Sequence, residues 1–192
     1  MGLKEKKNFN DKLKKWEEYK EVISNREIEY SNLLRNKYEE KFNAIKKEFI
    51  TYIEAYDLKY VKRQTFIEAD LENSLKFRID YEQPKLTNEY KFLLSIVEEQ
   101  RRQFIIVIKP NYKIYLPSLF KQRPKPHSTE QIDLLIDQII KDNDSIDREL
   151  NKLNNLNFNL SFYASDYSPT KTDVSKNYDS LVEIIETILS NN

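Results

Sequence analysis

The sequence predicts an α+β protein: a long, charged, coiled-coil-like N-terminal helix, followed by a small, mostly antiparallel sheet of four or five strands that helices cover. Residues 3–56 contain neither proline nor glycine, and single apolar residues recur there among charges of both signs, as in a long solvated helix. After Asp57, apolar and polar residues begin to alternate, which is the period of a strand. We therefore expect a helical arm over residues 1–56 and an α+β globular domain over residues 57–192.

The composition indicates a folded protein that lacks several common catalytic motifs. Hydrophobic residues make up 39% and charged residues 33% of the 192 positions, and the apolar residues are too regularly spaced for a disordered chain. Gly2 is the only glycine, so glycine-rich phosphate loops and a nucleophile elbow cannot be formed. The absence of cysteine excludes disulfides and thiolate metal sites.

Net charge and hydropathy limit the class of partner. The 32 lysines and arginines balance the 32 aspartates and glutamates, so any electrostatic function must be local. The first residues lack the apolar run of a signal peptide, and no stretch approaches the roughly 20 apolar residues of a membrane helix. We expect a cytoplasmic protein that binds no membrane and no cofactor.

An apolar stripe runs along the predicted N-terminal helix. A seven-residue spacing, with gaps at Lys20 and Glu27, is followed by Phe9, Leu13, Trp16, Ile23, Tyr30 and Leu34. After a four-residue shift, the pattern resumes at Tyr38 and continues to Tyr56. The stripe suits either a coiled coil, between molecules or as a hairpin, or a helix that lies along the protein's own sheet. We name these six residues as the candidate helix interface, through which the chain would form a homo-oligomer or bind a partner.

The next elements are predicted to be a hairpin and a helix. Residues 60–69 and 75–81 alternate apolar with polar side chains, and residues 70–74 form the turn between them. Thr87 is a suitable N-cap for a helix that ends near Gln103, because apolar residues recur there at helical spacing.

The centre of the sheet is expected next. Residues 104–108 are a continuous apolar run, which predicts a strand buried on both faces. Pro110 and Asn111 would turn the chain into a partner strand over residues 113–116. The three prolines within residues 117–127 then indicate an extended loop.

The C-terminal part is predicted to contain a helix, a strand and a final helix. Ser128 is the expected N-cap of the first helix, with Gln131 in the capping-box position. That helix carries a second heptad-like stripe with one polar break at Asn143. Residues 157–163 alternate as an edge strand would, and residues 178–189 have one apolar helical face.

Two groups of residues were weighed for catalysis. His127 is the only histidine, and the sequence offers it no partner, so we interpret it as a surface residue. Glu68, Asp70 and Glu72 would share one face of a continuing strand, as in a magnesium-dependent hydrolase. Acidic residues beside a turn are common, however, and we keep a metal-dependent hydrolase only as a minor alternative.

The strongest local pattern is a segment without acidic residues between Glu99 and Glu130. We name as candidate partner-binding residues its cations and two of its aromatic residues, which are Arg101, Arg102, Lys109, Tyr112, Lys113, Tyr115, Lys121, Arg123 and Lys125. Cations bind phosphates and exposed aromatic rings stack on bases, so a basic hairpin-loop of this kind could hold nucleic acid or an acidic protein. It could also pair with the Asp-rich helix that follows.

The sequence therefore favours a non-catalytic protein-interaction protein, such as an adaptor, an inhibitor or an assembly subunit. It would bind protein partners through the helical arm and the basic segment, because apolar and aromatic stripes without catalytic motifs are typical of recognition surfaces. The alternative is a nucleic-acid-binding protein that uses the basic segment over residues 100–129.

Overall fold

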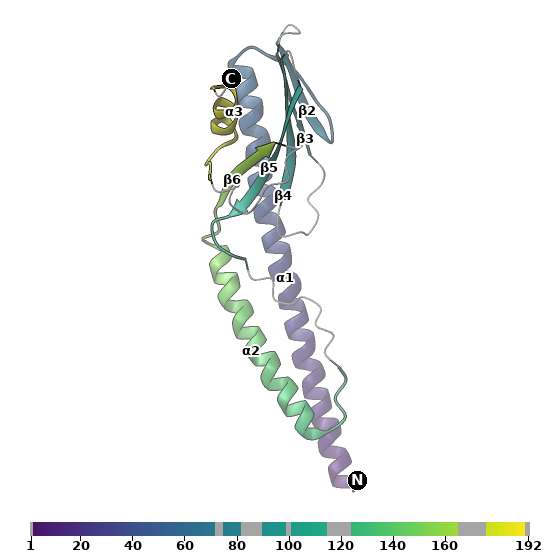
Figure 1. Cartoon of the computed structure of the whole chain (residues 1–192). Helices are drawn as coiled ribbons and strands as arrows, with labels where there is room; N and C mark the ends of the chain where they lie inside the picture. The colour runs from purple at the N-terminus through teal and green to yellow at the C-terminus, as the bar shows by residue number, and fades with distance from the viewer. Residues whose placement is uncertain are drawn as a thin grey trace. The chain divides into compact units, whose positions relative to one another are not determined.

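The computed structural model describes residues 2–71, 75–81, 90–98, 101–114, 124–164 and 176–190. Its helices and strands, in chain order, are α1 (Leu3–Ala55), β1 (Lys59–Lys62), β2 (Phe66–Leu71), β3 (Leu75–Asp80), β4 (Tyr90–Val97), β5 (Arg101–Pro110), α2 (Thr129–Leu153), β6 (Phe158–Ala164) and α3 (Leu181–Ser190) (Figure 1). The predicted α+β class and the long N-terminal helix are confirmed, with six strands in place of four or five. Among the helices described, none combines the length and apolar character needed to cross a membrane.

The chain divides into two compact units within α1. Unit 1 comprises residues 1–36 and 114–155, and unit 2 comprises residues 37–113 and 156–192. The apolar stripe of α1 changes register between Leu34 and Tyr38, so the shift in the sequence coincides with the boundary between the units. The predicted arm over residues 1–56, as a domain of its own, stays a prediction.

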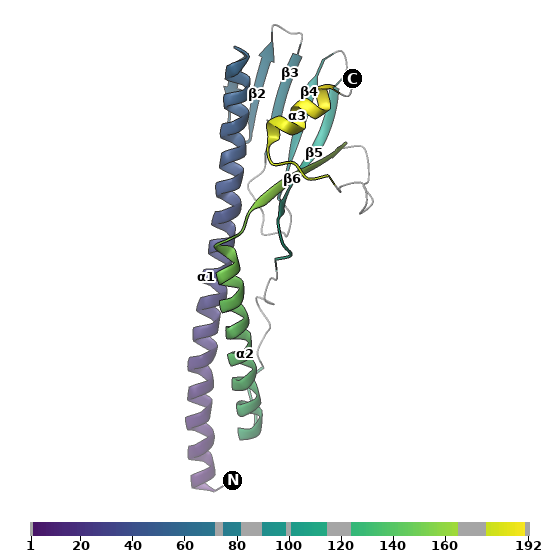
Figure 2. The same ribbon diagram turned by 90° about the vertical axis from the view of Figure 1, so that its left-hand side faces the viewer.

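Unit 1 is built on two parallel helices, α1 and α2, which lie side by side (Figure 2). Lys12 forms an ion pair with Asp133, and Arg26 forms one with Asp147, so residue numbers rise in the same direction along both helices. Arg26 also donates to Asn143 Oδ1 at 2.7 Å, which gives the polar break in the α2 stripe a partner. The unit thus pairs the two heptad-like stripes within one chain.

The start of α2 follows the predicted capping pattern. The side chain of Ser128 accepts a hydrogen bond from the backbone N–H of Gln131 at 3.2 Å. The Gln131 side chain in turn accepts one from the backbone N–H of His127 at 2.8 Å. The first bond satisfies a donor that the first helical turn leaves without an intrahelical partner, and the second ties the residue before the cap to that turn.

Unit 2 contains an antiparallel sheet in which each strand pairs with the next one along the chain. The remaining part of α1 packs on one face of this sheet through aromatic rings. Tyr38 stacks on Tyr90 with centroids 3.9 Å apart, and Phe42 meets the edge of Phe92 at 6.0 Å. Both of these sheet residues lie on β4. Because consecutive strands of the sheet are neighbours, one stripe of α1 can also reach the strands beside β4.

Helix α3 lies beside α1 and closes the β6 edge of the sheet. Glu48 of α1 accepts a hydrogen bond from Val182 N at 3.0 Å, and Tyr52 donates one to Glu186 at 2.7 Å. Just before α3, Tyr178 pairs with Leu160 of β6 through two backbone hydrogen bonds of 2.7 and 2.8 Å. The outer edge of β6 is therefore partly satisfied.

The structure corrects three predictions about the strands. The predicted helix ending near Gln103 is replaced by β4 and β5, which pair with each other from Tyr90↔Ile108 to Val97↔Arg101. Leu94 fits both a helical and an alternating pattern, and a short apolar run cannot distinguish them until its neighbours in the sheet are known. The proposed cap Thr87 lies outside the described residues.

The other two corrections concern strand boundaries. The predicted strand over residues 60–69 is two strands, β1 and β2, separated by three residues. The predicted strand 104–108 is confirmed within β5, but its neighbours are β4 and β6, and residues 113 and 114 belong to no strand. Residues 115 and 116 lie outside the described part of the chain.

The C-terminal end of α1 adopts a Schellman-type cap without glycine. Leu58 N donates to Ile53 O at 3.0 Å, and Asp57 N donates to Glu54 O at 3.1 Å. The apolar contact of this motif is provided by Ile53 and Leu58, which are both buried. Asp57 occupies the left-handed position with φ of 55°, where a Cβ is unfavourable and a negative charge also meets the negative end of the helix dipole.

We therefore expect Asp57→Gly to raise the free energy of unfolding by about 0.5–1 kcal/mol, because relief of the left-handed strain exceeds the entropy that glycine adds to the unfolded chain. Urea denaturation of the variant and the wild type measures this change in the free energy of unfolding. Asp57→Asn is the control for charge alone, since asparagine tolerates this conformation. A Gly variant less stable than the wild type would contradict the assignment of strain.

A second prediction concerns alkaline stability. Burial, and then the hydrogen bond to Glu186, raise the pKa of Tyr52. A hydroxyl whose pKa is raised in the folded state contributes stability below about pH 10, and this contribution is lost as the pH rises further. We expect Tyr52→Phe to flatten the fall of the free energy of unfolding above that pH.

Thermal or urea denaturation between neutral pH and pH 11 would check this expectation. The matched variant Glu186→Gln should flatten the curve less than Tyr52→Phe, because burial of Tyr52 is the larger cause and remains. An unchanged slope in Tyr52→Phe would show that other groups control the alkaline transition.

Candidate interaction surface

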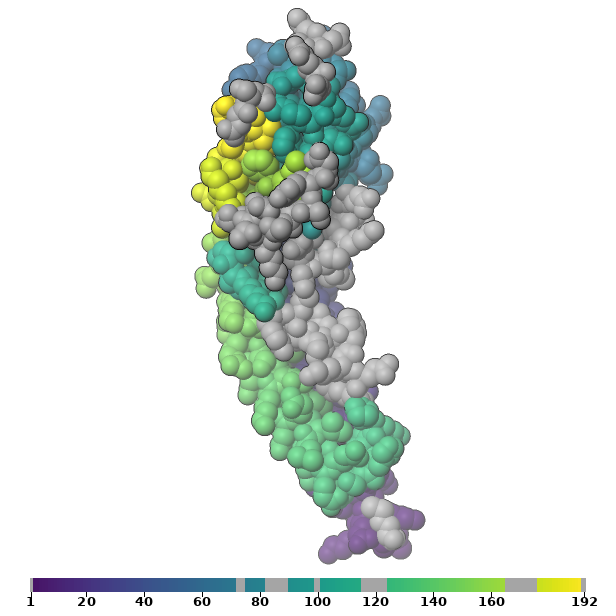
Figure 3. All heavy atoms as spheres, in the orientation of Figure 1, coloured from purple at the N-terminus to yellow at the C-terminus, as the bar shows by residue number. Residues whose placement is uncertain are grey.

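The candidate helix interface is largely covered within the chain. Trp16, Ile23, Tyr30 and Leu34 are buried in unit 1, while Phe9 and Leu13 are half-buried. Figure 3 shows the outward side chains of α2 along this unit. The stripe therefore packs beside the parallel helix α2 in unit 1 and on the sheet in unit 2, and a coiled coil stays a prediction. Self-association through these six residues stays a prediction, and it would require α2 to dissociate from α1.

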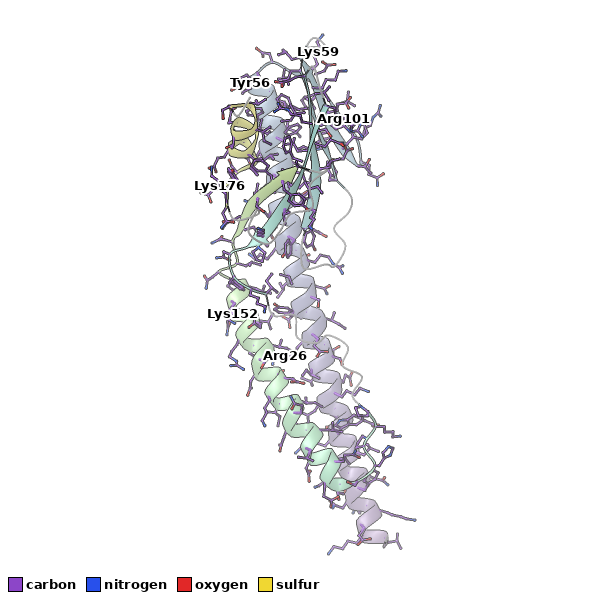
Figure 4. The ribbon with its side chains drawn as sticks, in the orientation of Figure 1. Arg26, Tyr56, Lys59, Arg101, Lys152 and Lys176 are labelled. Atoms are coloured by element: carbon purple, nitrogen blue, oxygen red, sulfur yellow. The ribbon has the colours of Figure 1, made fainter. Side chains whose placement is uncertain are left out.

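The candidate basic residues on β5 do not form one cluster. Arg101 and Arg102 begin the strand, and Lys109 lies eight residues further along it, about 27 Å away at 3.4 Å per residue. Arg102 forms an ion pair with Glu98 at 2.9 Å. Arg101 is exposed, and Figure 4 labels it.

The remaining candidate basic residues are distributed over different parts of the chain. Tyr112 is half-buried and Lys113 is exposed in the segment after β5, whereas Lys125 belongs to unit 1. Tyr115, Lys121 and Arg123 lie outside the described residues. Two acidic side chains of α2, Asp133 and Asp147, form ion pairs with cations of α1.

The residues that the sequence offers for catalysis do not form a catalytic cluster among the described residues. Glu68 forms an ion pair with Arg78 at 3.3 Å, and Asp70 forms one with Lys76 at 3.0 Å. Glu72 is not among the described residues. His127 is exposed, and within the described ranges no group of three or more acidic or histidine side chains could hold a metal ion.

The sequence reasoning missed a surface around β1. Four large apolar side chains are exposed there: Tyr56 (57%), Tyr60 (39%), Val61 (49%) and Leu71 (41%). They are all of the large apolar residues that are exposed in the described part of unit 2. We call these four residues the β1 surface.

The four residues of the β1 surface line one depression of about 550 Å³. Its remaining lining residues are Asp57, Lys59, Glu68 and Asp70. Tyr56 and Lys59, both labelled in Figure 4, follow the C-terminal end of α1. Clustered apolar exposure of this kind is typical of interaction sites, whereas scattered single apolar residues are normal on any protein surface.

The backbone of β1 is also available to a partner. β1 is the terminal strand of the sheet and pairs with β2 alone among the strands described. Arg63 N donates to Phe66 O at 2.8 Å, and hydrogen-bonded pairs alternate along an antiparallel ladder. Val61 and Lys59 therefore face β2 with their backbone groups, and Tyr60 and Lys62 turn theirs outward.

Cations gather at the Lys62 end of β1, whereas at the other outward residue the Tyr60 hydroxyl donates to Glu54 at 3.0 Å. Lys59, Lys62 and Arg63 form no ion pair in the part of the chain that the structure describes. The Lys46 ammonium of α1 lies 5.1 Å from the centre of the Tyr81 ring. Burial, and then the neighbouring Lys62, lower the pKa of Lys46. Within the described residues, neither Lys46 nor Lys62 forms an ion pair that would compensate this proximity.

A weak pattern in the sequence could have pointed to this surface. Arg63, Gln64 and Thr65 are three consecutive polar residues that interrupt the alternation of residues 60–69. Such a break is typical of a turn, and it separates β1 as a short strand of its own. That this strand would lie at an open edge follows only from the strand order.

Comparisons with known proteins do not add a function. The chain matches no protein-family model, no curated protein and no solved structure.

Proposed function

We propose that the protein is a non-catalytic protein-interaction protein, an adaptor, inhibitor or assembly subunit, and that it binds its partner protein through the β1 surface. The observation that carries this proposal is the gathering of Tyr56, Tyr60, Val61 and Leu71 at one open sheet edge. Keeping these side chains in water costs free energy that a partner could recover by covering them.

Two features support a protein rather than a small molecule as the ligand. The depression is bordered by a strand whose backbone donors and acceptors point outward, and extended peptides use such groups in recognition. Its lining combines apolar side chains with the charged residues Asp57, Lys59, Glu68 and Asp70, the mixture that protein interfaces combine as core and rim. The helical stripe proposed from the sequence is a weaker candidate, because Trp16, Ile23 and Tyr30 are already buried.

This proposal predicts that the double variant Tyr56→Ser/Val61→Ser loses about 90% of partner capture while its melting temperature changes little, since both side chains are exposed. The measurement is quantitative affinity capture from an extract of the native host, with recovered proteins and nucleic acids both determined. The matched control is Leu134→Ser, which removes a 70% exposed side chain from α2.

Capture of a specific set of proteins that both the control and the wild type retain, and that the double variant loses, would support the proposal. Equal capture by the double variant and the wild type would contradict it, because the β1 surface would then contribute nothing to binding.

The alternative function is nucleic-acid binding through the basic segment. It is favoured by the absence of acidic residues between Glu99 and Glu130, and by Arg101, which is exposed and forms no ion pair in the described structure. Against it, the described cations are spread along β5 and beyond, so few of them could contact neighbouring phosphates together.

A gel-shift titration with short DNA and RNA at two salt concentrations tests this alternative. If several phosphates are neutralised, the affinity should fall steeply, by about tenfold or more, between low and physiological salt, and Arg101→Glu should weaken it further. No shift at low salt with either nucleic acid would remove the alternative.

A further inference from the structure

We propose that the partner contributes an extended acidic segment, which adds to the sheet as a further strand along β1. This inference rests on the proposed function, because it specifies how a protein would occupy the β1 surface. It follows from three properties of unit 2 as far as the structure describes it: β1 pairs with one strand alone, two of its residues turn their backbone groups outward, and the cations beside them form no ion pair.

The open edge is the geometric condition for strand addition. The other edge of the sheet is partly closed, since Leu160 of β6 exchanges two backbone hydrogen bonds with Tyr178. At β1 the N–H and C=O groups of Tyr60 and Lys62 point away from β2, as the alternation from the Arg63–Phe66 bond requires. A partner strand can therefore form a ladder at these two residues without disturbing the pairing of β1 with β2.

Charge selects the chemistry of the partner strand. Lys62 stands beside Lys46, and Lys59 and Arg63 flank it along the chain. The acidic residues across the ladder, Glu68 and Asp70, are already held by cations of β3. Carboxylates on an incoming strand would meet cations that form no ion pair with any described residue, which favours an acidic segment over a neutral or basic one.

A second copy of this chain fits the edge less well. When β1 pairs antiparallel with its own copy so that the outward residues Tyr60 and Lys62 lie opposite each other, Lys59 lies opposite Arg63. Like charges directly opposite each other destabilise a strand pair. Lysine on an edge strand also commonly prevents self-pairing, because the lysines of two copies repel each other. The same lysines attract the carboxylates of an acidic partner.

The apolar part of the surface defines the second requirement on the partner. Side chains alternate between the two faces of a strand, so Tyr60 and Val61 project to opposite faces of the sheet. Val61 and Leu71 border the depression together with Tyr56. An acidic strand that also carries apolar side chains would cover these residues while its carboxylates meet Lys62 and Arg63.

The charge requirement is tested with a fluorescent synthetic peptide of alternating glutamate and valine, titrated with the full chain and followed by anisotropy. We expect the peptide with glutamate to bind about tenfold or more tightly than its counterpart with lysine. Lys62→Glu should remove this preference. Lys176→Glu, which changes an exposed lysine near the β6 edge (Figure 4), should leave it unchanged.

The backbone requirement is tested with two substitutions at one position. Lys62→Pro removes the outward N–H together with the charge, and Lys62→Thr removes the charge alone; neither removes a bond to β2. We expect the proline variant to bind the glutamate peptide several-fold more weakly than the threonine variant, at similar melting temperature. Hydrogen exchange supplies a second readout: the peptide should slow exchange at the amides of Tyr60 and Lys62 in the wild type.

The outcomes separate the mode of binding from the function itself. No preference for the glutamate peptide, or no slowing of exchange at Tyr60 and Lys62, would overturn strand addition by an acidic segment. If Tyr56→Ser/Val61→Ser still loses partner capture in that case, the protein-interaction function stands with a different mode of docking. Capture that survives every one of these substitutions would overturn both proposals.

Discussion

Aromatic packing of α1 on the sheet is the interaction on which unit 2 depends. Tyr38 and Phe42 contact rings on β4, Phe42 also contacts the ring that directly follows β3, and Tyr52 contacts a ring on β3. These contacts help to bury one face of a sheet in which each strand pairs with the next one along the chain. A meander of short strands has little stability until a second layer covers its apolar face. The same stretch of α1 also holds α3, through Glu48 and Tyr52.

This arrangement leaves the two edges of the sheet unequal. α3 and the residues before it lie next to β6, where Tyr178 satisfies backbone groups of Leu160. β1 directly follows the C-terminal cap of α1 at Asp57, and all four of its residues are exposed. The unequal edges explain why the exposed apolar side chains of unit 2 gather at β1.

The two kinds of packing along α1 require different surfaces from one helix. Beside α2, Ile23 and Tyr30 keep the seven-residue spacing that suits a neighbouring helix. On the sheet, Phe42, Ile45 and Phe49 form a stripe whose register is shifted by four residues. Such a shift locally unwinds a heptad pattern, and it lets one continuous helix serve two compact units.

The sequence by itself determined the elements in which a helical pattern extends over many residues. The helix over residues 3–56, the change of register near Leu34 and the cap at Ser128 could all be predicted, because helical spacing and capping are local properties. Tertiary structure decided the rest. Strand β4 could be separated from a helix only by its pairing with β3 and β5. The candidate surface at β1 likewise depends on strand order, and neither pairing nor an open edge is encoded in any single stretch of residues.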